Sequence, residues 1–258
     1  MFCLSHPCFD SVKSSFQSVI SIIIPAFNEE RLLASTLAQI NRARAAFASR
    51  GFGSELIVCD NNSTDRTAEM ARAAGALVTF EPVNQIARAR NTGAAAATGD
   101  WLLFIDADSR PTAELFADVT EQIRSGRCLA GGSTIRLEGN HRLANFMVGI
   151  WNWQSRSRRW LAGSFIFCEA AAFRKLGGFN PELFVGEELE LTARLQALGR
   201  ATRREIVILH RHPLLTSARK VRLYSTWEHV RFLFRVVTKR EATFRNREAC
   251  YAWYDGRR

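Results

Sequence analysis

The chain has 258 residues and 47% hydrophobic content, which is ordinary for a globular protein and argues against a disordered one. Its net charge of +10 is unevenly spread, because residues 200–258 hold 15 basic and 5 acidic side chains while residues 1–199 hold 20 of each. A basic C-terminal quarter favours anionic partners such as nucleotide phosphates, acidic lipid head groups or nucleic acid.

The cysteines and the N-terminus indicate the compartment. Six cysteines are scattered without a Cys-x-x-Cys pair, which is typical of reduced thiols in a cytosolic protein. The first 18 residues lack the charged start and continuous apolar centre of a signal peptide, and no apolar run has the length that spans a bilayer. We therefore expect a cytoplasmic protein, either soluble or peripheral on the inner face of the membrane.

The first half of the chain alternates short apolar runs with helical patterns. Strands are predicted over residues 19–24, 56–59, 77–80 and 101–105, and helices over 28–47, 65–74, 86–97 and 111–124. Strands that alternate with helices of about ten residues imply parallel βαβ units with right-handed crossovers. This half is predicted to be Rossmann-like and nucleotide-binding.

The second half is less regular. Strands are predicted over residues 129–137, 163–168 and 206–209, and helices over 141–160 and 170–175. A further helix carries Leu191, Leu195 and Leu198 as an apolar stripe and is predicted to end at Gly199. The last predicted helix runs from about Leu223 to Val237. The whole pattern predicts an α/β fold with a mostly parallel central sheet flanked by helices.

Two carboxylates follow a buried strand. Asp106 and Asp108 come directly after the apolar run Trp101–Ile105, at the sheet edge where open parallel sheets bind their ligands. Because they are separated by one residue, both can bind one hard cation such as Mg²⁺ or Mn²⁺. They can equally cap the helix that begins near Pro111. The residues alone leave both interpretations open.

Several short motifs occur in the order and spacing of a known family. From about Val19 to about Lys220 the chain resembles the family 2 glycosyltransferases, which have the GT-A fold. The motifs that carry the resemblance are Ile22–Glu30, Ile57–Thr67, Ala89–Gly93, Asp100–Pro111, Gly177–Phe179 and Glu187–Leu195. The resemblance implies the GT-A fold, a nucleotide-diphosphosugar donor and a divalent metal.

The resemblance also assigns the donor site. It implies that the donor is bound by Pro25, Ala26, Asn28, Glu29, Asp60, Arg90, Asp106, Arg219 and Lys220. Within this set, Asp60 would hydrogen-bond the base, and Arg219 and Lys220 would fold over the diphosphate. The alternatives are a helix start for Asn28 and Glu29, a turn for Asp60, and ordinary solvated charges for the basic residues.

The resemblance favours the metal interpretation of the acid pair. The family's Asp-x-Asp motif maps onto Asp106 and Asp108, whose cation would bridge the donor diphosphate and neutralise the charge on the leaving nucleotide. His210 follows the last predicted strand and is a candidate third metal ligand. The alternative is a surface histidine beside Arg211 and His212.

The catalytic base is predicted in the acidic cluster that begins at Glu187. The family usually has Glu-Asp there, whereas this chain has Glu187-Glu188, and either carboxylate can serve as a general base. Both lie roughly 50° from the apolar stripe of the helix, so periodicity does not choose between them. The resemblance chooses Glu188. The alternative is that these acids only favour a helix N-terminus.

We therefore expect an inverting, metal-dependent glycosyltransferase. The predicted GT-A domain covers residues 19–220, with a nucleotide-binding half (19–110) and an acceptor half (111–220). Residues 1–18 are a predicted N-terminal extension. Residues 221–258 are a predicted basic helical segment whose apolar stripe docks either on the domain or on an anionic membrane near a lipid-linked acceptor.

Two alternative functions remain. A nucleotidyltransferase has a related sheet, but it would show a Gly-rich phosphate loop where this chain has Pro25–Asn28. A non-catalytic nucleotide- or nucleic-acid-binding protein would draw on the basic C-terminal quarter and bind in a strongly salt-dependent way. We do not expect nucleic acid to be the partner.

Overall fold

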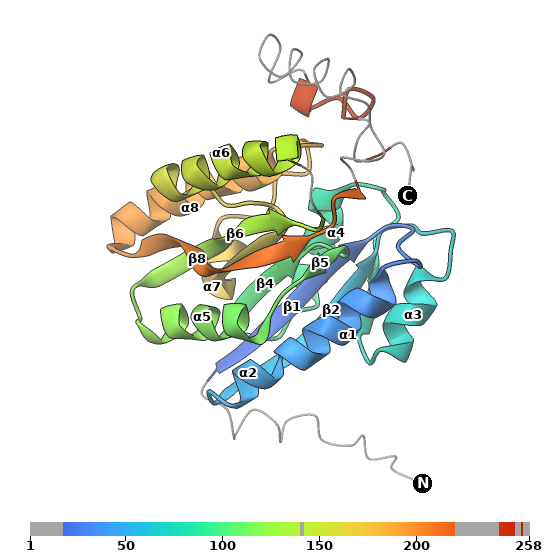
Figure 1. Cartoon of the computed structure of the whole chain (residues 1–258), viewed down its shortest axis with the longest axis horizontal. Coiled ribbons are helices and arrows are strands. Elements are labelled where there is room, and N and C mark those ends of the chain that lie inside the picture. The colour runs from blue at the N-terminus through green and yellow to red at the C-terminus, as the bar shows by residue number, and fades with distance from the viewer. Residues whose placement is uncertain (1–17, 140–141, 220–242, 251–253, 255–258) are drawn as a thin grey trace, which may run out of the picture.

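The computed structural model describes residues 18–139, 142–219, 243–250 and 254 (Figure 1). Lys220, Cys3, Cys8 and the helix predicted from Leu223 lie outside these ranges, as does nearly all of each predicted terminal segment. The strands are β1 (Ser18–Ala26), β2 (Phe52–Asp60), β3 (Leu77–Phe80), β4 (Trp101–Ile105), β5 (Ser109–Arg110), β6 (Cys128–Leu137), β7 (Phe165–Glu169) and β8 (Glu205–Thr216).

Within the described residues, these strands form one sheet in the order β3-β2-β1-β4-β7-β6-β8-β5. Strands β1 to β4 are parallel, as the βαβ pattern predicts. Strand β7 runs antiparallel to both of its neighbours, β4 and β6, so β6 points in the same direction as β4. Strand β8 is parallel to β6. The carboxyl ends of β1, β2, β4, β6 and β8 therefore lie at one edge of a mostly parallel sheet, which confirms the predicted fold class.

Helices cover both faces of the sheet (Figure 1). They are α1 (Leu33–Ala43), α2 (Ala45–Ala48), α3 (Thr67–Ala73), α4 (Ile86–Ala95), α5 (Ala113–Arg124), α6 (Arg142–Arg158), α7 (Ala170–Lys175) and α8 (Glu187–Thr202). One core joins the sheet to α1, α2, α3 and α5, and the other joins it to α4, α7 and α8. Strand β4 contributes Leu103 and Ile105 to the first core and Leu102 and Phe104 to the second, which explains its unbroken apolar run.

The helix predicted over residues 28–47 begins later, at Leu33, and is interrupted between α1 and α2. Its predicted first turn is instead a loop, held by the segment that follows β2. The backbone N–H groups of Asn28, Glu29 and Glu30 donate to side chains of that segment at 2.8–3.1 Å. Tertiary hydrogen bonds therefore satisfy these donors.

The end predicted for α8 was wrong, because the helix continues past Gly199 to Thr202. A Cβ at Gly199 would lie 2.7 Å from the carbonyl oxygen of Arg204, whose N–H donates to the Gly199 carbonyl at 2.8 Å. This glycine therefore allows the returning chain to approach the helix. The residue in the left-handed conformation at the helix end is Arg203, with φ of 55°.

The last strand is longer than the predicted range of residues 206–209. Its register against β6 passes from Ser133–Leu209 to Ile135–Leu214, so His210–Pro213 form a bulge and the strand resumes at Leu214. The polar residues of the bulge resemble a strand end in the sequence. The end of β8 also pairs with β5, a two-residue strand that has no sequence signal.

Two further expectations concern the cysteines and the membrane. Cys59, Cys128, Cys168 and Cys250 are buried and form no disulfide, and burial raises the pKa of Cys59 to about 11, so this thiol stays protonated. Across the described ranges, no helix combines the length and the apolar character that crossing a bilayer requires.

Substitution of two glycines, one in the sheet and one on an exposed helix, tests how tightly each position is packed. Gly131 in β6 faces the ring of Phe167, and an added Cβ would overlap that ring and lie 2.8 Å from Val207. We expect Gly131→Ala to lower the free energy of unfolding by about 1–3 kcal/mol through overpacking. Gly149 on α6 has open space around it, so Gly149→Ala should raise that free energy by up to about 1 kcal/mol. Urea unfolding followed by circular dichroism measures both, and equal stabilities of the two variants would contradict this packing.

Candidate active site

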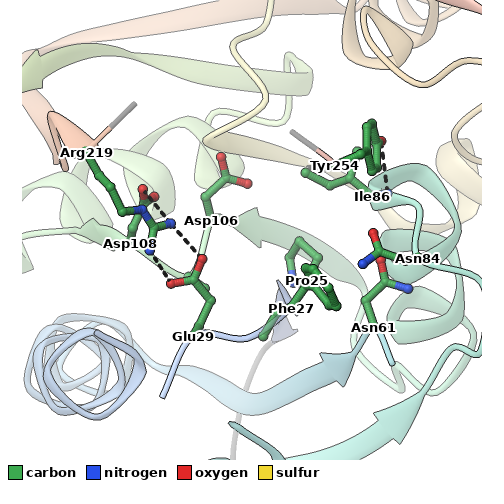
Figure 2. A pocket seen from close by; sticks show the side chains of 12 residues that line it. Pro25, Phe27, Glu29, Asn61, Asn84, Ile86, Asp106, Asp108, Arg219 and Tyr254 are labelled. Carbon is green, nitrogen blue, oxygen red and sulfur yellow. Dashed lines mark hydrogen bonds and ion pairs between the residues drawn. The ribbon is translucent and has the colours of Figure 1, made fainter. Parts of the chain in front are cut away.

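A pocket of about 590 Å³ opens at the carboxyl edge of the sheet, between the loops that follow β1, β2 and β4 (Figure 2). The pocket is lined by Pro25, Ala26, Phe27, Glu29, Asn61, Asn84, Ile86, Asp106, Ala107, Asp108, Arg219 and Tyr254. Six of the residues predicted to bind the donor or the metal are therefore brought together here, from β1, β4 and the segment after β8.

Two predicted donor residues shape the loops and are not among the side chains that line this pocket. Asn28 has a left-handed backbone with φ of 52°, and its side-chain oxygen accepts from the N–H of Thr64 at 2.8 Å. Asp60 is buried, and its carboxylate accepts from the N–H of Ser63 at 3.1 Å. Asn28 thus connects the loop after β1 to the turn after β2, and Asp60 orders that turn.

Arg219 connects the two acidic sides of the pocket (Figure 2). Its guanidinium donates two hydrogen bonds to the carboxylate of Glu29, at 2.7 and 2.8 Å, and lies 3.6 Å from Asp108. Burial alone would lower the pKa of Arg219, but Glu29 and then Asp108 raise it. The guanidinium is therefore a fixed positive charge beside the carboxylates that a cation would need.

Arg90 is the most enclosed charge of the site, with 2% of its side chain exposed. It donates to Glu187 at 2.7 Å, to Asp106 at 3.0 Å and to the carbonyl of Gly163 at 2.8 Å. Its guanidinium also lies 5.2 Å from the ring centre of Phe179. Burial would lower the pKa of Arg90, but Asp106 and then Glu187 outweigh it. Arg90 therefore joins the acids of β4 to those of α8.

A second pocket lies next to the first and holds both candidate bases. It is lined by Ile86, Arg90, Asp106, Gly163, Ser164, Phe184, Val185, Gly186, Glu187 and Glu188. Asp106 and Ile86 line both pockets, so the two cavities share a wall. A molecule in the second pocket would lie between the candidate bases and the carboxylates of the first.

Burial raises the pKa of Glu187 and of Glu188 above the ordinary range of a carboxyl group. The negative charge of Glu188 raises the pKa of Glu187 further, and Arg90 opposes both shifts. Two carboxylates this close titrate as a unit. The two carboxyls therefore share a proton above the ordinary carboxyl range, and Arg90, which donates to Glu187, favours the first negative charge of the pair.

The oxygen ligands at the end of β4 fit a hard divalent cation. Asp106 and Asp108 both line the first pocket, and Mg²⁺ commonly uses one or two carboxylates together with substrate phosphates. No group of three or more His, Cys, Asp or Glu residues that could hold a metal occurs in the described part of the chain. His210 lies in the bulge of β8, exposed, with its Nδ1 3.3 Å from the carbonyl oxygen of Ile208.

Sequence reasoning missed several lining residues. Phe27 and Asn61 lie inside quoted motifs and could have been found from them. Gly163 and Ser164 line the second pocket and lie outside the quoted motifs. Tyr254 is far along the chain, yet its hydroxyl donates to the carbonyl of Phe184 at 2.9 Å and accepts from the N–H of Ile86 at 3.4 Å.

Comparison with known proteins gives consistent matches. Residues 21–175 match the model of glycosyl transferase family 2. An uncharacterized glycosyltransferase of Mycobacterium tuberculosis is 31% identical over 141 residues, covering 54% of this chain and 60% of the relative. A UDP-Glc:α-D-GlcNAc-diphosphoundecaprenol β-1,3-glucosyltransferase of Escherichia coli is 31% identical over 94 residues, 35% of each protein.

Among solved structures, a mannosyltransferase from Pyrobaculum calidifontis in complex with GDP-mannose and Mn²⁺ has a TM-score of 0.65 at 20% identity. The match covers 89% of this chain and 62% of that one. This likeness shows that the fold is GT-A. The chain spans less than two thirds of the length of each of these three proteins.

Replacement of the buried Arg90 guanidinium tests the charge balance of the site. We expect Arg90→Met to lower the free energy of unfolding by about 3–5 kcal/mol near pH 8, because Asp106 and Glu187 lose their buried partner. Glu187, whose pKa is already raised, then has a still higher pKa in the folded state, so stability is retained at low pH and lost as the pH rises. The loss should therefore be smaller at pH 5.

The control for this prediction is Arg88→Met, which replaces an exposed arginine of the same helix whose guanidinium donates to the side chain of Gln85. We expect it to leave stability nearly unchanged, and Arg90→Lys, which keeps the charge, to recover part of the loss. Urea unfolding at several pH values measures all three variants. A loss in Arg90→Met that did not vary with pH would contradict the assigned charge balance.

Proposed function

The chain belongs to glycosyl transferase family 2, and we propose that it moves a sugar from a nucleotide-diphosphosugar to an acceptor hydroxyl, with inversion and with the help of a divalent metal. The observation that carries this proposal is the pair of adjoining pockets that share Asp106. One pocket offers carboxylates and a cationic side chain to a donor. The other offers a raised-pKa carboxyl to an acceptor.

The first pocket is the proposed donor site. Asp106 and Asp108 would hold Mg²⁺ or Mn²⁺, which when bound stabilises the negative charge of the leaving diphosphate. Arg219 is already beside Asp108 and supplies a second positive charge to the same group. The Mn²⁺ and GDP-mannose of the Pyrobaculum mannosyltransferase, which has a similar fold, support this assignment.

Glu188 is the proposed general base. It takes the proton of the acceptor hydroxyl while that oxygen bonds the anomeric carbon, on the face opposite the diphosphate, whose bond to the same carbon breaks. Such a direct displacement inverts the configuration at that carbon. Glu187, held by Arg90, lies beside Glu188, and the two buried carboxyls share the raised proton affinity that a general base needs.

A lipid-linked molecule is the acceptor class that we propose. The name of the Escherichia coli relative specifies an acceptor attached to diphosphoundecaprenol. Such an acceptor stays in a bilayer, so the enzyme would work as a peripheral protein at the inner membrane face.

A panel of donors tests the first pocket. We expect one of UDP-, GDP- or dTDP-sugars to raise the melting temperature only in the presence of Mn²⁺ or Mg²⁺. At a donor concentration of 100 Kd the rise should be roughly 5–10 °C. Asp108→Ala should abolish it, whereas Asp118→Ala, a carboxylate on α5 that lines neither pocket, should retain it. Absence of stabilisation by every donor in every metal condition would refute the donor site.

Substitution of each acid tests the base. We expect Glu188→Gln to lower kcat by about 10²–10⁴-fold with donor binding unchanged, and Glu190→Gln, which removes the partner of Arg194, to have little effect. Wild-type kcat/KM should fall as the pH drops through a pKa above the ordinary carboxyl range. In Glu187→Gln this fall should move to lower pH, because the neighbouring negative charge is gone. Near-normal transfer by Glu188→Gln, with loss in Glu187→Gln, would assign the base to Glu187.

A further inference from the structure

Helix α6 presents large apolar side chains to solvent. Ser155 is the buried residue of this 17-residue helix. The exposed apolar side chains, called here the outward stripe, are Leu143 (69% exposed), Phe146 (65%), Met147 (52%), Ile150 (39%) and Trp153 (68%). At about 100° per residue they span an arc of about 120°. An exposed stripe of this size indicates an interaction surface.

The outward stripe lies on the side of α6 that faces away from the domain. Asn152 fixes the opposite side, because its side chain bonds both the N–H and the carbonyl of Ile135 in β6. Ser155 lies on the same side as Asn152. At the C-terminal end of the helix, Gln196 of α8 donates to the carbonyls of Arg158 and Arg159. Among the described residues, the domain therefore holds α6 by the side that carries Asn152 and Ser155, and the apolar side chains of the outward stripe stay exposed.

The charges of α6 are all positive. The helix contains Arg142, Arg156 and Arg158, and it has no Asp or Glu. Near its end, the guanidinium of Arg158 lies 4.7 Å from the ring centre of Trp160, which in turn lies 6.5 Å from the ring of Trp151. An apolar stripe bordered by arginine and tryptophan is the composition of helices that lie in the interface of a bilayer.

Charge argues against the two occupants that the chain itself could supply. A symmetric contact between two copies through α6 would bring their arginines together with no carboxylate of the helix between them. The segment 220–242 holds six basic and two acidic residues, so it has the same sign of charge as α6. The positive charge of α6 therefore favours an anionic partner.

We propose that the outward stripe docks on an anionic phospholipid bilayer. The apolar side chains enter the region between head groups and acyl chains, while the arginines pair with lipid phosphates. The chain that leaves α6 runs directly to Gly163 and Ser164, whose carbonyls accept from Arg90 and from the N–H of Asp106. Docking thus places the second pocket near the lipid surface. That this position would help the pocket to receive a lipid-linked acceptor rests on the proposed function. The docking of α6 on a bilayer does not depend on that function.

Co-sedimentation with vesicles tests the proposal on the full chain. We expect wild-type protein to bind mixed phosphatidylcholine–phosphatidylglycerol vesicles at least about tenfold more strongly than vesicles of phosphatidylcholine alone. The double variant Phe146→Ser with Trp153→Ser should lose at least about tenfold of this binding. The matched control is Leu77→Ser with Phe80→Ser, two apolar residues of β3 that are 52% and 57% exposed, and it should bind like wild type.

A second pair of variants tests the charge. Arg142→Gln with Arg156→Gln should lose the preference for anionic vesicles, whereas Arg72→Gln with Arg127→Gln, exposed arginines elsewhere, should keep it. Because all these side chains are exposed, the melting temperatures should equal that of wild type. Transfer to a short, water-soluble acceptor analogue should also be unchanged in the stripe variant, which separates docking from catalysis.

Two outcomes would overturn the proposal. One is equal vesicle binding by wild type and the Phe146→Ser, Trp153→Ser variant, which would place the membrane contact elsewhere or show that there is none. The other is a wild-type dimer in analytical ultracentrifugation that the same variant converts to monomer. A second copy of the chain would then cover the outward stripe.

Discussion

The carboxylates of the site can lie close together because one buried guanidinium neutralises them. Asp106 comes from the end of β4 and Glu187 from the start of α8, and Arg90 of α4 bonds both. Without a cation, acids buried at this spacing would take up protons or move apart. The position of Arg90 thus sets the separation of the two pockets and also the proton affinity of the acid pair. Its contact with Gly163 extends the same constraint to the chain that follows α6.

The sequence was informative wherever one chemical signal dominated a segment. The apolar run of β4 and the acids that follow it predicted a central strand that ends at a ligand site, and the structure places both acids in the first pocket. The prediction for Arg90 was less complete. An arginine on a helix looks like a solvated or ligand-binding side chain, and its burial depends on carboxylates 16 and 97 residues away in sequence. Local patterns carry no such long-range information.

The incorrect boundaries have one physical cause, which is that tertiary contacts overrode local preferences. Gly199 is the usual residue at a helix end, but here the backbone at Arg204 requires the space that a side chain would fill. His210–Pro213 resemble a loop because they bulge out of a strand that then resumes. Tyr254 had no motif to mark it, since its role is to join the segment before α8 to the start of α4. Each of these features became visible only when distant segments could be placed side by side.

The contacts that complete the first pocket also indicate the order in which parts of the chain fold. Arg219 meets Glu29 across 190 residues of sequence, and Tyr254 meets Ile86 across 168. Contacts of such separation cost the most loop-closure entropy and form late in folding. Strands β1 to β4 can pair through short crossovers well before Arg219 arrives. A nascent chain would therefore have its parallel strands β1 to β4 before it has a complete first pocket, because Arg219 and Tyr254 come later in the sequence than those strands.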